Sequence, residues 1–143
     1  MDTSTLFSLK GRTALVTGGS RGIGKMIAAG FIAQGAKVYI SSRKADVCDA
    51  AAAEMGPNCF SLPQDVSTVA GCQMLADEYF KHEKSLDILV NNAGAAWGEA
   101  FETFPESGWD KVMDLTRQAH GRIRGQGHGW TMGTRTLMDK ATR

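Results

Sequence analysis

The stretch Thr17-Gly18-Gly19-Ser20-Arg21-Gly22-Ile23-Gly24 decides the fold of this 143-residue chain. It follows the short apolar run 12–17, and apolar residues take helical spacing from Gly22 onward. A strand, a glycine turn and a helix start in this order present free N–H groups to a dinucleotide pyrophosphate. Gly18 permits the turn, Gly22 lets the backbone approach phosphate, and Gly24 lets the helix pack closely on the strand. A turn that holds no ligand is the alternative.

Apolar runs and helical periods alternate along the chain up to residue 117. The pattern predicts strands near 12–17, 37–41, 59–62 and 86–90, and helices from 22, over 45–55, over 67–80 and from 105. Ser67 is the expected cap of the third helix. The residues expected to share one face of the first helix are Ile23, Met26, Ile27, Gly30 and Phe31. The order βαβαβαβα predicts an α/β protein, a parallel sheet covered by helices on both faces.

The end of the second predicted strand reads Ser41-Ser42-Arg43-Lys44. An NAD-binding domain carries Asp or Glu about 20 residues past the glycine turn, to hold the ribose 2′-hydroxyl. A guanidinium and two hydroxyls suit a 2′-phosphate instead, and Arg21 can close on it from the first turn. The pattern favours NADP(H) as cofactor; the alternative is two solvated cations on a loop.

Two further motifs follow the third and fourth strands. Asp65 can accept from the adenine amino group while Val66 covers the ring, and a turn-capping role for Asp65 has equal weight. Asn91-Asn92-Ala93-Gly94 supplies the amides and small residues of a ligand-lined crevice, with a plain asparagine turn as alternative. The predicted cofactor-binding residues are Gly18, Ser20, Arg21, Gly22, Ile23, Gly24, Ser42, Arg43, Asp65, Val66, Asn92, Ala93 and Gly94.

Together these residues resemble the short-chain dehydrogenase/reductase family over residues 9–116. The glycine turn matches the family's TGxxxGxG motif, and Asp65-Val66 and residues 91–94 match its adenine-binding and NNAG motifs in order and spacing. The resemblance implies a doubly wound Rossmann-type sheet, and hydride transfer between NADP(H) and a carbonyl or alcohol. Segments 7–12 and 108–115 are most similar to the 3-oxoacyl-(acyl carrier protein) reductase-like branch.

The family's catalytic groups are not found in this sequence. The resemblance implies an Asn, a Ser and a Tyr-x-x-x-Lys pair, but Thr116 takes the place of the Asn. Tyr39 and Tyr79 are followed four residues later by Arg43 and Glu83. We therefore predict no catalytic residue here, and a sheet that ends after about four strands and the family's fifth helix. A non-catalytic NADP-binding remnant, or an interaction partner of a full-length relative, is the alternative to an oxidoreductase. The family also implies a homo-oligomer, which the short chain puts in question.

The composition changes abruptly after Arg117. Residues 118–143 carry five Lys/Arg, one acid and five Gly, with neither helical nor strand spacing. We predict an NADP-binding Rossmann half-domain over 1–117, and an unrelated tail over 118–143 that is disordered or out of frame. RNA contact by a genuine tail is a weaker alternative, because aromatic residues are not interleaved with its cations.

Composition argues against several other classes of protein. A net charge of +1 gives no reason to expect a nucleic-acid or membrane-surface partner. No stretch approaches the ~20 apolar residues of a membrane span, and the N-terminus lacks the pattern of a secretory signal. Cys48, Cys59 and Cys72 form no C-x-x-C pair and have no clustered His beside them. They argue against a disulfide framework or metal site and suit a reducing cytoplasm.

Overall fold

The computed structural model describes residues 6–95, 103 and 105–123. Strands and helices alternate along this part of the chain, as the sequence predicts. The elements are β1 (Thr13–Thr17), α1 (Gly22–Ala33), β2 (Lys37–Ser41), α2 (Ala45–Met55), β3 (Cys59–Ser61), α3 (Val69–His82), β4 (Ile88–Asn91) and α4 (Glu106–Ile123).

The four strands form one parallel sheet in the order β3-β2-β1-β4. The chain runs outward from β1 to β3, then crosses back and places β4 on the other side of β1. The helices that follow β1 and β4 lie on opposite faces of the sheet, α1 on one and α4 on the other. Open α/β sheets bind their ligands at such a reversal of strand order. The predicted α/β class is confirmed.

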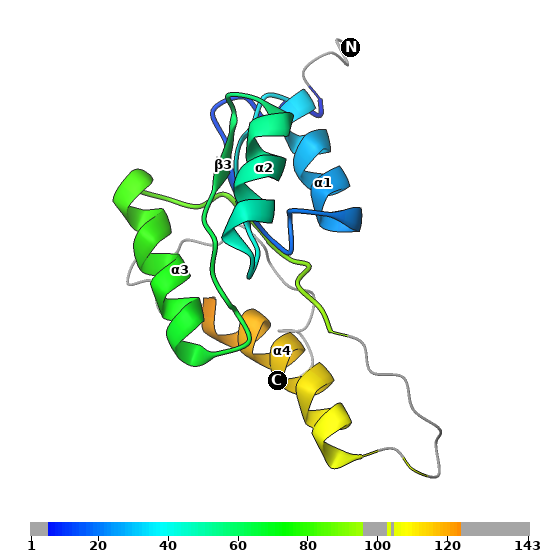
Figure 1. The fold of residues 1–143 in the computed structure, drawn as a ribbon. Coiled ribbons are helices and arrows are strands. Elements are labelled where there is room, and N and C mark those ends of the chain that lie inside the picture. The colour runs from blue at the N-terminus through cyan, green and yellow to red at the C-terminus, as the bar shows by residue number, and fades with distance from the viewer. Residues whose placement is uncertain (1–5, 96–102, 104, 124–143) are drawn as a thin grey trace, which may run out of the picture.

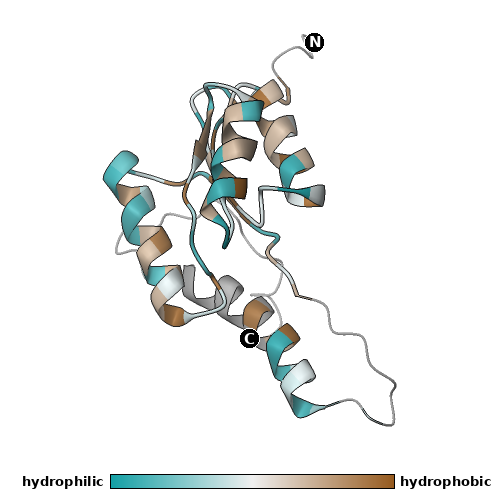
Figure 2. Cartoon of the chain, viewed as in Figure 1, coloured by the Kyte–Doolittle hydropathy of each residue, from teal (hydrophilic) through white to brown (hydrophobic). Residues whose placement is uncertain are grey.

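Helices cover both faces of the sheet (Figure 1). One face packs against α1 and α2, and its core includes Val16, Ala28, Ile40, Cys48 and Cys59. The opposite face packs against α3, with Leu115 of α4 at its margin, and its core includes Leu15, Tyr39, Val66, Cys72 and Tyr79. Hydrophilic and hydrophobic stretches alternate along α3, as expected of a helix with one buried side (Figure 2).

The buried side of α1 differs from the predicted one. Ile23 and Met26 are 70% and 74% exposed, whereas Gly24 and Ala28 are buried against the sheet. Ile27 and Phe31 are half-buried and pack at the edge of the same core. Small residues lie where the helix crosses closest to the strands, because a larger side chain would hold the two apart. The face of α1 predicted from the spacing of apolar residues is therefore rotated about the helix axis relative to the face that is buried.

Three element boundaries also differ from the sequence prediction. Thr68, not Ser67, caps α3, and its hydroxyl accepts a hydrogen bond from the backbone N–H of Gly71 at 3.0 Å. Strand β4 is Ile88–Asn91, shifted from the expected 86–90. Helix α4 continues to Ile123 and so crosses the boundary that the sequence suggested after residue 117. Residues 124–143 lie outside the described part.

Strand β4 has one neighbour within the described residues. It pairs with β1 from Ala14↔Ile88 to Thr17↔Asn91, and no described strand pairs with its far side. Ile88, Leu89 and Val90 are half-buried. Of the helices described, none has the length and apolar character that a membrane crossing requires.

The Asp87 carboxylate fastens the start of β4 to the start of β1. It accepts hydrogen bonds from the backbone N–H of Thr13 at 2.8 Å and from Nη1 of Arg12 at 2.8 Å. The Thr13 hydroxyl adds a third bond at 3.3 Å. The Thr13 N–H bond, with the Arg12 guanidinium next, lowers the pKa of Asp87 below its ordinary value of 3.8.

We predict that Asp87→Asn reduces the free energy of unfolding by about 1 kcal/mol at pH 7, because a charge-assisted acceptor is lost. The pKa of Asp87 is lowered in the folded state, so its contribution is complete at neutral pH and disappears as the pH falls below about 4. Parent and variant should therefore converge in stability as the pH falls through the lowered pKa of Asp87, followed by urea titrations. Asp77→Asn, a matched change on the surface of α3, should have little effect. A difference that does not shrink as the pH falls below about 4 would contradict this role of the carboxylate.

We also predict that the backbone amides of Ile88–Asn91 exchange with solvent faster than those of Ala14–Thr17. Within the described residues, strand β1 is paired on both sides and β4 on one. An unpaired edge is open to water and to other chains. Hydrogen exchange on the 143-residue polypeptide measures this directly, and light scattering reports the expected self-association. Equal protection of the two strands in a monomer would show that the edge is covered.

Candidate dinucleotide site

The turn between β1 and α1 takes a form that requires glycine. Gly18 and Gly22 have φ of 67° and 55°, in the left-handed region that other residues rarely adopt. At Gly24 a Cβ would collide with the carbonyl oxygen of Gly18 and lie 2.5 Å from Nδ2 of Asn92. Gly22, in contrast, has nothing within 4 Å of the place where a Cβ would stand. The turn is therefore packed tightly from behind and open at the start of the helix.

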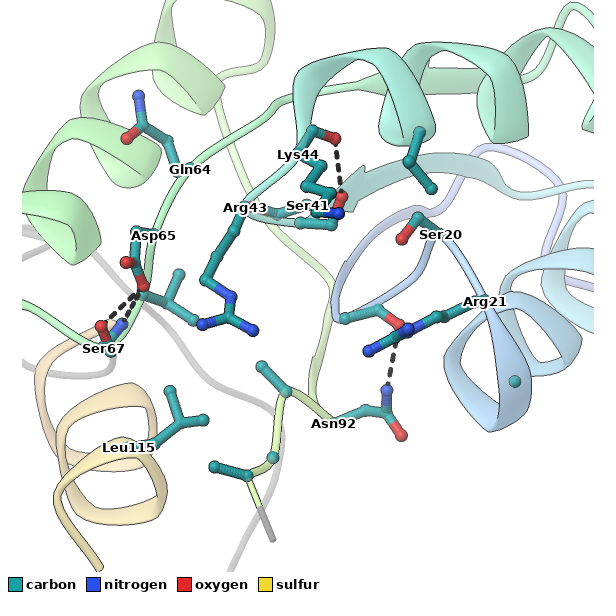
Figure 3. Close-up of a pocket in the computed structure, with 18 of the residues that line it drawn as sticks. Ser20, Arg21, Ser41, Arg43, Lys44, Gln64, Asp65, Ser67, Asn92 and Leu115 are labelled. Atoms are coloured by element: carbon teal, nitrogen blue, oxygen red, sulfur yellow. Dashed lines mark hydrogen bonds between the residues drawn. The ribbon is translucent and has the colours of Figure 1, made fainter. Parts of the chain in front are cut away.

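Thr17 and Asn92 hold this turn against the end of β4. The Thr17 hydroxyl accepts from the backbone N–H groups of Asn92 and Ala93, both at 3.1 Å, and donates to the carbonyl of Val90 at 3.3 Å. Nδ2 of Asn92 donates to the carbonyls of Thr17 at 3.1 Å and Gly18 at 3.3 Å, and Figure 3 marks one of these two bonds. The amide nitrogen of Asn92 is thus used within the protein, whereas the sequence suggested a crevice-lining ligand group.

The end of β2 places two kinds of polar group beside the turn. Arg43 is exposed and points from β2 toward the same opening that Arg21 enters from the start of α1 (Figure 3). Ser42 is half-buried and its hydroxyl donates to the carbonyl of Lys44 at 3.3 Å. Ser41 is buried under the turn, and its backbone carbonyl accepts from the N–H groups of Gly18 and Gly19.

Asp65 caps the turn before α3. Its Oδ1 accepts from the Ser67 hydroxyl at 2.7 Å and from the Ser67 N–H at 3.0 Å. The Ser67 hydroxyl, more than the N–H or the nearby Arg43, lowers the pKa of Asp65 below its ordinary range. The capping alternative is therefore realised. Both bonds use Oδ1, so Oδ2 stays compatible with a ligand contact.

These segments enclose a pocket of about 1090 Å³. All the predicted cofactor residues line it except Gly24, which packs behind the turn. The further lining residues, absent from the predicted set, are Ser41, Lys44, Val47, Gln64, Ser67, Ala95, Lys111 and Leu115. Lys111 and Leu115 are one helical turn apart on α4, and an i, i+4 spacing in a helix that starts near Pro105 was the only sequence signal for them.

Both tyrosines of the chain are structural. Tyr39 and Tyr79 are buried in the core under α3, and the Tyr39 hydroxyl donates to Oε1 of Glu83 at 2.8 Å. The Tyr79 hydroxyl donates to the carbonyl of Ser85, and burial raises the pKa of Tyr79 to about 12. Neither residue lines the pocket. The backbone of Thr116 lies in α4, and its side chain is outside the described part.

Comparisons with known proteins agree with this geometry. A sequence profile described as short chain dehydrogenase matches residues 12–122. The chain is 51% identical over 111 residues to the rhamnolipids biosynthesis 3-oxoacyl-[acyl-carrier-protein] reductase of Pseudomonas aeruginosa, with 76% of this chain and 43% of the relative covered.

Two solved structures show the same fold. The Pseudomonas aeruginosa RhlG/NADP active-site complex superposes with a TM-score of 0.80 and 46% identity, over 86% of this chain and 48% of that one. A 3-ketoacyl-(acyl-carrier-protein) reductase from Brucella melitensis, complexed with NADH, gives 0.76 and 28% over 82% and 48%. The chain thus spans about half the length of these relatives. With the profile matched over most of its residues and its motifs assembled at one pocket, the chain belongs to the short-chain dehydrogenase family.

Proposed function

We propose that the pocket binds a nicotinamide dinucleotide and prefers NADP(H) to NAD(H). The observation that carries the proposal is the pair Arg21 and Arg43, which reach the same opening from two elements (Figure 3). The end of β2 supplies Ser42 where an NAD-binding domain has a carboxylate. Two guanidinium groups and a hydroxyl suit the 2′-phosphate, which only NADP(H) carries.

The rest of the pocket suits the other parts of the cofactor. The open space beside Gly22, at the positive end of the α1 dipole, suits the pyrophosphate. Val66, Ala93 and Leu115 give the pocket an apolar wall that suits the adenine ring. Four of the lining side chains are basic and one, Asp65, is acidic. This balance favours a ligand with several negative charges.

By relationship, the reaction is hydride transfer between NADP(H) and a carbonyl or alcohol, with a 3-oxoacyl thioester as the substrate class suggested by the relatives at 51% and 46% identity. The nicotinamide supplies the hydride when the cofactor is bound. This chain's residues would bind and orient the cofactor, and a proton donor has to come from elsewhere, because the sequence holds no Tyr-x-x-x-Lys pair. The same absence favours the second candidate, a non-catalytic NADP-binding protein or an interaction partner of a full-length relative.

We predict that the chain binds NADPH more tightly than NADH. Arg43→Ala should weaken NADPH binding about tenfold, the loss expected for one charge-assisted hydrogen bond, and leave NADH binding nearly unchanged. Fluorescence titration measures both affinities. Lys81→Ala, which removes a cation that pairs with Glu78 on α3, is the matched control and should change neither. Equal affinity of the parent chain for the two cofactors would contradict the proposed preference.

We predict no turnover of ketones, aldehydes or alcohols by a polypeptide of these 143 residues with NADP(H). The sequence lacks the general acid, and Thr116 cannot make the two-sided contacts of an amide. The measurement is NADPH oxidation with a 3-oxoacyl thioester. Protein-dependent oxidation that survives removal of contaminating reductases would assign catalysis to residues other than the family's.

A further inference from the structure

The first turn of α3 lies directly against a segment that lines the pocket. Asp65 and Val66 line the pocket from the connection between β3 and α3. Thr68, the capping residue of the helix, bonds to both sides of this junction. Its hydroxyl donates to the backbone carbonyl of Asp65 at 3.5 Å and accepts from the N–H of Gly71 at 3.0 Å. The start of α3 and the Asp65–Val66 segment are therefore held together.

Gly71 permits this close approach because it has no side chain. A Cβ at this position would collide with the carbonyl oxygen of Asp65 and lie 2.8 Å from its carbonyl carbon. The backbone of Gly71 is helical, without the positive φ that would by itself require glycine. Glycine is also a weaker helix former than alanine. The lack of a Cβ at Gly71 therefore serves its contact with the Asp65 carbonyl.

Cys72 contacts the next residue of the same segment. Its Sγ donates to the backbone carbonyl of Val66 at 3.3 Å, and both residues belong to the core under α3. On the other side, the N–H of Gln64 donates to the carbonyl of Ser42, just after β2, at 3.0 Å. The segment is thus tied to the sheet at one end and packed against α3 at the other. Its place in the pocket depends on both contacts.

We infer that Gly71 and Cys72 are positioning residues, which fix the Asp65–Val66 segment where it meets the adenine ring of the dinucleotide. Neither of them lines the pocket, so they act through this segment. The inference rests on the proposed function, since it takes the dinucleotide as the ligand. The two guanidinium groups that favour the 2′-phosphate come from other elements. The positioning residues therefore contribute affinity for NADPH and NADH alike, without contributing to the preference between them.

The first test is Gly71→Ala in the full 143-residue chain, with NADPH, NADH and 5′-AMP titrated by calorimetry below the thermal midpoint. The added methyl group displaces the Asp65–Val66 segment, so all three affinities should fall about tenfold, as for the loss of one hydrogen bond. The preference for NADPH over NADH should remain. Gly30→Ala is the matched control in α1, where a Cβ has nothing within 4 Å, and it should change no affinity.

A second pair of variants separates positioning from a loss of stability, and it decides the matter if Gly71→Ala does not fold. Cys72→Ala removes the donor to the Val66 carbonyl and should weaken binding of all three ligands about fivefold. Cys72→Ser retains a donor and should restore the affinities of the parent. Asp87→Asn, which lowers stability away from the pocket, should leave them unchanged.

The contrary outcomes are distinct. Unchanged affinities in Gly71→Ala and Cys72→Ala, with binding by the parent, would overturn this inference alone. Equal losses in the two Cys72 variants, or a loss in Asp87→Asn, would trace weaker binding to lower stability and overturn it too. So would a preference for NADPH that disappears together with the affinity. A parent chain that binds neither dinucleotide would overturn the proposed function, and this inference with it.

Discussion

The Thr17 hydroxyl is the point on which the geometry of the pocket depends. It accepts two backbone N–H groups from the residues after β4 and donates to the Val90 carbonyl, so all of its hydrogen-bonding capacity is used within the protein. In the other direction, the side-chain amide of Asn92, after β4, donates two hydrogen bonds to the backbone carbonyls of Thr17 and Gly18, at the end of β1. Five hydrogen bonds thus connect the carboxyl ends of β1 and β4. The chain leaves β1 and β4 in different directions at this reversal of strand order. These hydrogen bonds therefore fix the width of the pocket opening between the two strand ends.

The glycines of the turn follow from this closeness. Gly24 has no room for a Cβ because the Gly18 carbonyl and the Asn92 amide already fill the space. A side chain there would force α1 away from the sheet and separate the groups that Thr17 and Asn92 hold together. Gly22 is needed for its backbone conformation and for the open space beside it. Glycine is thus required at Gly24 for close packing, and at Gly22 for backbone conformation and open space.

The element order and fold class could be predicted from the sequence because they depend on local patterns. The apolar runs of β1 and β2 and the glycines after β1 are readable within a few residues. The buried face of α1 could not be predicted in this way, since Ile23 and Met26 fit the helical period as well as Ile27 and Phe31 do. The deciding factor, the close approach of Gly24 and Ala28 to the strands, is a property of the packed structure. The extent of α4 to Ile123 could not be predicted from the sequence either, because Gly121 weakens a helix without always ending it.

The pocket was predictable where a motif supplies a lining residue at the end of a strand. Arg21, Arg43 and Val66 are of this kind, and the structure brings them to one pocket. Asn92 lines the pocket, but its amide bonds could not be foreseen, since they depend on a partner 75 residues away. Lys111 and Leu115 come from α4, whose position over the pocket is a matter of tertiary structure.

The cysteines are divided between the two cores on either side of the sheet, so thiol modification can report on each core separately. Cys48 and Cys59 lie in the core under α1 and α2, and Cys72 lies in the core under α3. All three thiols are buried, and burial raises the pKa of Cys59 to about 11, so little of it is thiolate in the folded chain. Alkylation of each thiol therefore requires its own layer to open. The ratio of modified Cys72 to modified Cys48 records which side of the sheet separates first.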